Sequence, residues 1–533
     1  MKMTSAVLVV FVAASAAAAL HAQPKERPLP RVVKKDGRFA LFVDDAPYLM
    51  LGAQAHNSSG WPAMLPKVWP AMEYLNVNTV EIPVYWEQFE PRPGQYDYTA
   101  IDALLAGARE HRVRLVLLWF GTWKNGSQHY MPEWMKVAPD RYPHILDKNG
   151  HAADSPSPYA AASLAADESA FAAFMRHLKA ADPQRTVIMV QVENEPGTWD
   201  SLRDYSPVAQ KLFEAPVPLE VLAAMQVKAA SPSPNWQEAF GPEADVCFHA
   251  WSVAKYVGQV AAAGKAAYPL PLYANAALRD PLKPGAPGTY ESGGPTDNVL
   301  AIWKAAAPAL DVLAPDIYVN DPAAYLKVLE LYHRDDNPLF VPETGGPGNE
   351  RFFFSALGLQ AIGYSPFGMD YTRSRSAAEA SRPREEVLTP WAMNYRLIGP
   401  MQREIARLNF EGKLQAVAEE RGRITETMPF GAWNAVVSYG VTRNNRAAGN
   451  PEPTGRVLVG QLKDNQFLVA GFFCRVDFRP AGAGQHRQFL RVEEGVYENG
   501  VFKFLRIWNG DETDWGLNFG AEPVVLRVSL ATY

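Results

Sequence analysis

The chain has 533 residues, of which 48% are hydrophobic and 20% are charged, and its formal net charge is −6. This length suffices for one large domain and a smaller one, and the composition is that of a globular protein rather than a disordered chain. The mildly acidic charge argues against a polyanionic partner, so no nucleic acid is expected as a ligand.

The first 22 residues have the layout of a signal peptide. Lys2 supplies the positive end, an apolar run covers residues 6–13, and Ala19-Leu-His-Ala22 forms a plausible cleavage site. The sequence therefore predicts an exported protein, periplasmic or secreted. The apolar run is too short for an anchor, so no membrane span is expected.

Two cysteines, Cys247 and Cys474, lie far apart in the sequence. In an oxidising compartment they could pair, and they could equally remain free buried thiols, because connectivity does not follow from spacing. The sequence has no HxxxH or CxxC cluster. We therefore expect no metal and no other cofactor.

A hairpin is predicted over residues 39–48, with Asp44 and Asp45 at its turn. Apolar strand patterns and helix patterns then alternate. The predicted strands cover residues 48–53, 79–85, 114–120, 186–195, 270–275, 312–318, 339–343 and 361–367. The helices between them are predicted at residues 69–75, 98–111, 167–181, 248–263, 296–307, 323–335 and 350–357. This α/β alternation predicts a (β/α)8 TIM barrel over residues 23–409, and the absence of a Gly-rich turn after the first strand disfavours an open nucleotide-binding sheet.

Two long connections, residues 199–246 and 276–297, follow predicted strands and are rich in Pro, Ser and Gly. We interpret them as lids or binding loops, with disorder as the alternative. A helix over residues 390–408 is expected to close the barrel. Short β-like runs separated by turns then predict a C-terminal antiparallel β-sandwich over residues 410–533.

Two strands of this pattern deliver a glutamate onto a turn. They are Val190-Gln-Val-Glu-Asn-Glu-Pro-Gly197 and Pro338-Leu-Phe-Val-Pro-Glu-Thr-Gly345. Active sites of such barrels lie at the C-terminal ends of the strands, so both glutamates should reach one site. Two carboxyl groups there suit glycoside hydrolysis, in which one protonates the leaving oxygen and the other attacks the anomeric carbon or activates water.

Strand periodicity does not choose between Glu193 and Glu195. Side chains alternate with a period of two, so Gln191, Glu193 and Glu195 are all expected to face the barrel mouth. Glu195 comes last, just before the Pro-Gly turn, where a substrate can reach it. We expect the deeper Glu193 to hold a basic or amide partner.

The residues resemble glycoside hydrolase family 35, the β-galactosidases of clan A. Asn78-Thr-Val-Glu-Ile-Pro-Val-Tyr-Trp86 is similar to that family's second-strand motif, and Gln191-Val-Glu-Asn-Glu195 to its fourth-strand motif. The resemblance implies a retaining exo-β-galactosidase acting on β-galactoside oligosaccharides or plant polysaccharide side chains, xyloglucan among them. It also implies that Glu195 is the acid/base, that Asn194 contacts the sugar 2-hydroxyl, and that Glu343 is the nucleophile.

The third strand departs from the family 35 pattern. It ends in Leu118-Trp-Phe-Gly-Thr-Trp-Lys-Asn125, which is closer to family 42 β-galactosidases and other clan A members. The usual galactose contacts on this strand cannot be carried over, so Trp123, Lys124 and Asn125 would have to replace them. The resemblance thus points to a divergent bacterial branch of family 35 with its own C-terminal β domain.

Further candidates stand at other strand ends. We expect His56 and Asn57 to contact sugar or to make structural hydrogen bonds. The resemblance to clan A implies that Tyr318 hydrogen-bonds the nucleophile. Aromatic residues are usual platforms for sugar rings. Trp86 and Trp123 either stack on the ring or wall the barrel, and Trp199 would form an aglycone platform.

Two other functions remain open from the sequence. One is another clan A β-glycosidase, such as a β-glucosidase or an α-L-arabinosidase. The other is a non-catalytic carbohydrate-binding barrel, although such a protein gains nothing from two apposed carboxyl groups. Neither the oligomeric state nor the role of the β domain follows from the sequence.

Overall fold

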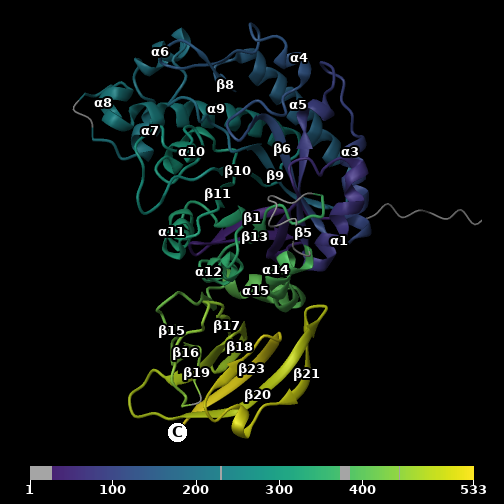
Figure 1. Cartoon of the computed structure of the whole chain (residues 1–533), viewed down its shortest axis with the longest axis vertical. Helices are drawn as coiled ribbons and strands as arrows, with labels where there is room; N and C mark the ends of the chain where they lie inside the picture. The colour runs from purple at the N-terminus through teal and green to yellow at the C-terminus, as the bar shows by residue number, and fades with distance from the viewer. Residues whose placement is uncertain (1–26, 229–230, 373–383, 443) are drawn as a thin grey trace, which may run out of the picture.

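The structure is a computed structural model that describes residues 27–228, 231–372, 384–442 and 444–533. A barrel surrounded by helices is followed by two antiparallel sheets, and the helices α12, α14 and α15 lie between them (Figure 1). The predicted signal peptide, residues 1–22, lies outside the described residues.

Eight parallel strands close into a barrel, which confirms the predicted (β/α)8 fold. In chain order they are β4 (Met50–Gln54), β5 (Thr79–Tyr85), β6 (Arg114–Lys124), β9 (Val187–Asn194), β10 (Leu272–Ala276), β11 (Val312–Ile317), β12 (Phe340–Thr344) and β13 (Gly363–Pro366). The helices that follow them are α1 (Leu65–Leu75), α3 (Thr99–Glu110), α5 (Ala161–Ala181), α9 (Ala244–Ala267), α10 (Leu300–Ala306), α11 (Pro322–Tyr332), α12 (Phe352–Gly358) and α14 (Arg384–Ile398). The strands are buried along their whole length except at Arg114, because helices cover the outer face and side chains fill the interior.

A small antiparallel sheet closes the N-terminal end of the barrel. It comprises β1 (Arg31–Lys35), β2 (Arg38–Val43) and β3 (Ala46–Tyr48). Asp44 and Asp45 form the predicted turn with positive φ angles of 55° and 61°, as a two-residue hairpin turn of the primed type requires. Leu41 and Val43 pack into the apolar cluster of the barrel interior. The C-terminal end of the barrel therefore provides the mouth.

The two long loops are ordered over the residues that the structure describes, so the alternative of disorder is wrong there. The loop after β9 contains α6 (Pro207–Phe213), α7 (Leu219–Ala224) and α8 (Trp236–Phe240). Trp236 of α8 is buried against Phe248 of α9. The loop after β10 is joined to the first loop by an antiparallel bridge between Thr198 and Ser292, in which the two residues exchange hydrogen bonds of 2.8 and 3.0 Å.

The predicted helix over residues 390–408 is wrong as a single element. The chain forms α14 and then α15 (Gln402–Phe410), separated by a short 3-10 turn over Gly399–Met401. Pro400 lies in that turn and has no N–H with which to continue a helical hydrogen-bond ladder. The axis therefore breaks there, and α15 leads directly into the first strand of the β domain.

The β domain is a sandwich, as predicted. One sheet has six strands: β14 (Leu414–Ala418), β17 (Arg456–Lys463), β18 (Gln466–Phe472), β23 (Val524–Thr532), β20 (Arg487–Glu498) and β21 (Val501–Ile507). The other has four: β15 (Thr425–Phe430), β16 (Trp433–Tyr439), β19 (Cys474–Pro480) and β22 (Leu517–Phe519).

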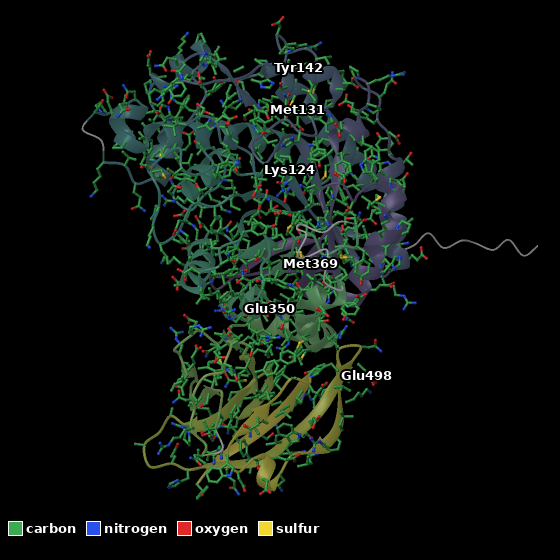
Figure 2. All side chains as sticks on the ribbon, viewed as in Figure 1. Lys124, Met131, Tyr142, Glu350, Met369 and Glu498 are labelled. Carbon is green, nitrogen blue, oxygen red and sulfur yellow. The ribbon has the colours of Figure 1, made fainter. Side chains whose placement is uncertain are left out.

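The six-stranded sheet is buried on both faces at its centre. Val457 and Val459 of β17 pack into the core between the two sheets, whereas Leu458, between them, belongs to the core cluster of the barrel. Because strand side chains alternate, one face of this sheet contacts the second sheet and the other contacts the barrel helices. The side chain of Arg456 donates a hydrogen bond of 2.7 Å to Asn394 of α14 at this junction. Glu350 lies beside the same junction (Figure 2).

Cys247 of α9 and Cys474 of β19 are both buried free thiols. Across the described residues, no helix combines the length and apolar character needed to cross a membrane.

Candidate active site

Glu343 lies at the C-terminal end of β12, where the sequence pattern predicts it. Its carboxylate accepts a hydrogen bond of 2.5 Å from the hydroxyl of Tyr318 and one of 3.1 Å from the side-chain amide of Gln54. Tyr318 follows β11, and Gln54 is the last residue of β4. In the barrel, β11 and β4 lie on either side of the neighbouring pair β12 and β13. The side chain is 6% exposed. Two fixed donors suit a carboxylate that must stay ionised and correctly aimed.

Glu195 follows β9 directly, and the backbone before it is irregular. Glu193 and Glu195 both have positive φ angles, 63° and 43°. The pairing of β9 with β6 also shifts register between Trp119 and Lys124. A non-glycine residue with positive φ is uncommon and breaks the alternation of a strand. The prediction that Gln191, Glu193 and Glu195 face the same way is therefore wrong.

Glu193 lies on the helix side of the strand rather than in the barrel mouth. It is fully buried and accepts a hydrogen bond of 2.7 Å from the backbone N–H of Trp123. Its other neighbour is Asp167 of α5, and burial together with that carboxyl raises the pKa of Glu193 well above its usual range. The Glu193 carboxyl therefore bonds a backbone N–H, and the expected basic or amide side-chain partner is not found among the described residues.

Glu195 belongs to the mouth. Its backbone N–H donates a hydrogen bond of 2.9 Å to the side-chain oxygen of Asn275 at the end of β10. Burial raises the pKa of the Glu195 carboxyl, the ammonium of Lys124 lowers it, and the carboxylate of Glu343 raises it, so that the net direction is upward. Retention of a proton near neutral pH is what a general acid needs.

Lys124 and Asn194 form a polar pair beside Glu195. The two residues are register partners at the ends of β6 and β9, and the Lys124 ammonium donates a hydrogen bond of 2.7 Å to the side-chain oxygen of Asn194. The ammonium also donates to the side chain of Asn125. The amide nitrogen of Asn194 is buried and has no acceptor in the described part of the chain. A sugar hydroxyl can supply that acceptor. Lys124 is buried, and Figure 2 labels it within the barrel domain.

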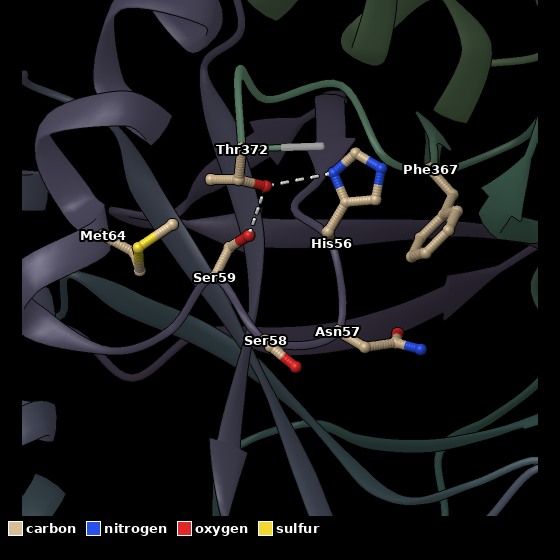
Figure 3. A pocket seen from close by; sticks show the side chains of 7 residues that line it. All are labelled: His56, Asn57, Ser58, Ser59, Met64, Phe367 and Thr372. Carbon is tan, nitrogen blue, oxygen red and sulfur yellow. Dashed lines mark hydrogen bonds between the residues drawn. The ribbon is translucent and has the colours of Figure 1, made fainter. Parts of the chain in front are cut away.

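A cavity of about 440 Å³ lies at the mouth, beyond the C-terminal ends of β4 and β13. It is lined by residues after β4 and β13: His56, Asn57, Ser58, Ser59, Met64, Phe367 and Thr372 (Figure 3). His56 Nδ1 is 2.6 Å from a carboxylate oxygen of Asp370. Burial alone would raise the pKa of Asp370, but hydrogen bonds from His56 and Thr372 lower it to about 2. His56 is therefore held firmly by an ionised partner.

Both polar tips that face this region are unpaired. His56 Nε2 and Asn57 Oδ1 are buried and make no hydrogen bond with any described residue. Unpaired buried polar atoms are costly unless a ligand or water satisfies them. His56 thus makes the structural hydrogen bond through one ring nitrogen and leaves the other nitrogen for a ligand.

Of the two alternatives for Trp86 and Trp123, the structure bears out walling of the barrel, so their assignment as sugar-binding residues is wrong. Trp86 is fully buried and donates its indole N–H to Glu90, and Trp123 is fully buried and donates to Ser155. Both belong to the core between strands and helices, so neither has a free face for a sugar. Trp199 differs, because its side chain is 55% exposed just beyond Glu195.

Four residues of the site were not singled out as functional from the sequence: Gln54, Asn275, Asp316 and Glu291. The first three end their strands, which is a usable indication in a barrel. Glu291 lies in the loop after β10, and only the fold brings it to the mouth. Its side chain fills space left by two glycines, since a Cβ on Gly126 would lie 2.5 Å from its carboxyl oxygen and one on Gly197 would lie 3.2 Å from its Cγ. Burial and the carboxyl of Glu195 raise the pKa of Glu291 well above its usual range.

Among the described residues, no group of His, Cys, Asp and Glu has the arrangement of a metal site. The chemistry that the described geometry permits is acid–base and nucleophilic catalysis by the two glutamates.

The family model of glycoside hydrolase family 42, described as beta-galactosidase, matches residues 60–260. A model described as a domain of unknown function matches residues 391–520, which include most of the β domain. No curated protein matches the sequence.

The fold is similar to several solved structures. The β-galactosidase of Bacillus circulans sp. alkalophilus shares 14% identity at a TM-score of 0.47, over 67% of this chain and 57% of that one. The β-galactosidase of Rahnella sp. R3 shares 16% sequence identity at a TM-score of 0.46, and the match covers 68% of this chain and 58% of that one. The catalytic domain of the Paenibacillus polymyxa β-amylase shares 13% sequence identity at a TM-score of 0.46, and the match covers 64% of this chain and 96% of that one. The chain thus spans less than two thirds of either β-galactosidase.

The family match corrects one prediction from the sequence. Family 35 is not supported, and the model that matches is that of family 42. The departure of the third strand from the family 35 pattern agrees with this correction. The match to this family model over residues 60–260, together with the closed parallel barrel, supports a glycoside hydrolase enzyme.

Proposed function

We propose that the protein is an exported, retaining exo-β-galactosidase that releases terminal β-galactose from oligosaccharides or plant polysaccharide side chains. One observation carries the catalytic part of the proposal. Glu195, with a raised pKa, and Glu343, held by Tyr318 and Gln54, lie at the same barrel mouth and influence each other electrostatically. The description of the matched family model supports galactose as the sugar.

The reaction follows from the two environments. Glu195 donates its proton to the glycosidic oxygen while the Glu343 carboxylate attacks the anomeric carbon, and the aglycone leaves as an alcohol. Glu195, now ionised, removes a proton from water. That water attacks the same carbon, releases galactose with the β configuration and frees Glu343.

The cavity at the ends of β4 and β13 has room for a terminal sugar. Its volume of about 440 Å³ lies in the lower part of the roughly 300–1,000 Å³ range of small-ligand pockets. His56 Nε2, Asn57 Oδ1 and Asn194 Nδ2 are buried polar atoms that sugar hydroxyls can satisfy. Such atoms give strong discrimination, because a substrate that lacks the matching hydroxyl leaves them unpaired.

The test is a panel of aryl glycosides with the purified protein: β-galactoside, β-glucoside, β-mannoside and α-L-arabinoside. We expect turnover of the β-galactoside and, by NMR of the first product, β-galactose before mutarotation. Turnover of another glycoside alone would replace the sugar in the proposal. First release of the α anomer would contradict retention. Binding of galactose without turnover of any glycoside would favour a non-catalytic binding protein.

A further inference from the structure

Asp316 lies between the two glutamates but has no role in the mechanism described above. It lies on β11 directly opposite Glu343 of β12 in the parallel pairing. Side chains alternate along a strand, so Asp316 faces the same side as Tyr318, which reaches Glu343. The residue is 3% exposed. Asp316 thus belongs to the layer directly beneath the barrel mouth.

An asparagine links Asp316 to the acid/base. The side-chain nitrogen of Asn275 donates a hydrogen bond of 2.6 Å to Asp316 Oδ2. The oxygen of the same amide accepts the backbone N–H of Glu195 at 2.9 Å. One planar amide therefore fixes both the Asp316 carboxyl and the backbone of Glu195. With Oδ2 occupied in this way, the position of Oδ1 is also fixed.

The other oxygen of the Asp316 carboxyl, Oδ1, has no hydrogen-bond donor near it among the described residues, as expected for an oxygen that carries a proton itself. It is buried, and no N–H or O–H of a described residue is donated to it. Asn275 holds Asp316 Oδ2 and the backbone N–H of Glu195 with one amide, so the two carboxyl groups are neighbours, and a hydrogen bond between two carboxyl groups requires a proton on one of them. An ionised Asp316 would add a negative charge next to the Glu343 carboxylate, and a third one once Glu195 has given up its proton, with Lys124 as the nearby cation.

The titratable groups that face Asp316 come from several elements. They are Glu195 after β9, Glu343 of β12, Lys124 of β6, Tyr273 of β10 and Tyr332 of α11. Burial raises the pKa of Asp316 well above its usual range, the two glutamates raise it further, and Lys124 lowers it. These surroundings agree with a neutral carboxylic acid at neutral pH.

We propose that Asp316 is a positioning residue: a neutral carboxylic acid whose Oδ1–H is donated to the Glu195 carboxyl and holds it in the orientation that proton transfer requires. This inference rests on the proposed glycosidase function. One oxygen of Glu195 is held by Asp316, and the other oxygen carries the transferable proton. When Glu195 becomes ionised, the same O–H is donated to its carboxylate. Asp316 keeps its proton through both steps.

The test compares Asp316→Asn with Asp316→Ala. An asparagine keeps an N–H donor and an acceptor in the same shape, so kcat should stay within about threefold of the native enzyme, and the pH profile should keep its alkaline limb. An alanine removes the donor, so kcat should fall about 30-fold or more, with KM changed less than about threefold. Asp140→Asn, at an exposed aspartate, is the matched control.

Two results would overturn the proposal. One is an Asp316→Asn variant as impaired as Asp316→Ala, with its alkaline limb moved to another pH, since Asp316 would then act as an ion. The other is an Asp316→Ala variant with native kcat. Circular dichroism and thermal unfolding check the fold, and Asp316→Ser serves as the second truncation if the alanine variant does not fold.

A measurement that does not use activity separates this inference from the proposed function. The infrared difference spectrum between native enzyme and Asp316→Asn at pH 7 should show the loss of a protonated carboxylic acid C=O band. A loss of carboxylate bands alone would contradict the inference, whatever glycoside the enzyme hydrolyses. If the native enzyme hydrolysed no glycoside but the Asp316→Asn variant still lost the C=O band, the proposed function would be wrong and the protonation of Asp316 would stand.

Discussion

The hydroxyl of Tyr318 lies 2.5 Å from Oε1 of Glu343 and donates a hydrogen bond to it across the ends of two neighbouring strands. Tyr318 is 39% exposed, so the contact lies at the open edge of the mouth, where a sugar would bind. A charge-assisted hydrogen bond of this kind stabilises the ionised nucleophile and fixes its direction.

Replacement of Tyr318 by phenylalanine should therefore slow the enzyme without unfolding it. Loss of a hydrogen bond to a charged group costs about 1.5–3 kcal/mol, which corresponds to a decrease in kcat of roughly 10- to 100-fold. Steady-state kinetics on the best aryl glycoside measures this decrease in kcat. Tyr533→Phe, at an exposed C-terminal tyrosine, should leave kcat unchanged. A native kcat in Tyr318→Phe would show that the hydrogen bond does not support the nucleophile.

Small-nucleophile rescue should assign the two glutamates separately. Glu343→Gly with azide should yield the α-glycosyl azide, because azide replaces the nucleophile and inverts the anomeric centre. Glu195→Ala with azide should yield the β-glycosyl azide, because azide attacks the covalent intermediate. Because Glu195→Ala lacks general acid–base catalysis, its rate of hydrolysis of glycosides with poor leaving groups should also fall by about 10²–10⁴-fold.

Product NMR distinguishes the two azides. The same anomer from both variants would remove the assignment of roles. A Glu193→Gln variant is the matched control, because Glu193 lies on the helix side of β9, and it should give no azide product.

Lys124 should set the pH at which Glu195 loses its proton. Its ammonium lowers the pKa of Glu195, so Lys124→Met should raise that pKa. The acid form then persists to higher pH, and the alkaline limb of kcat/KM should move upward. Activity at the optimum should also fall, because Asn194 loses its hydrogen bond. A limb that stays in place or moves downward would contradict the prediction. Lys136→Met, at a surface lysine, is the control.

Glu81 should make the barrel less stable as pH rises. It is fully buried, and burial is the main cause that raises its pKa from 4.5 to about 8. Between these values the unfolded chain has lost this proton and the folded chain keeps it, so the free energy of unfolding falls as pH increases. Glu81→Gln should remove this dependence and stabilise the fold by about 3 kcal/mol at pH 7.

Urea unfolding at pH 5, 7 and 8.5 checks this prediction. The stabilisation by Glu81→Gln should be small at pH 5 and larger at pH 7. Glu110→Gln, at an exposed position of α3, should change nothing. Equal stabilisation at pH 5 and pH 7 would show that the carboxyl does not titrate as described.

Trp199 should contribute to binding of the leaving group. An exposed indole beside the acid/base can stack on an aglycone ring, an interaction worth about 0.5–1.5 kcal/mol. Trp199→Ala should therefore lower kcat/KM for an aryl or disaccharide substrate by roughly 2- to 10-fold. A glycosyl fluoride has no aglycone ring and should be hydrolysed at the native rate. Equal losses on both substrates would contradict an aglycone platform, and Trp515→Ala provides an exposed control in the sandwich.

The sequence by itself determined the barrel, the appended sandwich and the strand ends on which Glu195, Glu343, His56 and Tyr318 lie. These follow from local information, because apolar periodicity defines strands and helices, and a parallel barrel brings all strand C-termini to one face. The family assignment did not follow, since short strand motifs are shared across a clan.

Only the tertiary structure decided which way the side chains point. Positive φ angles at Glu193 and Glu195 break the alternation of β9, and no residue-level propensity predicts them, because the surrounding strands impose them. Trp86 and Trp123 are buried by helices distant in sequence. Asp316 and Glu291 reach Glu195 through strand register and loop packing. The protonation states of such carboxyl groups depend on burial and neighbouring charge, which exist only in the folded chain.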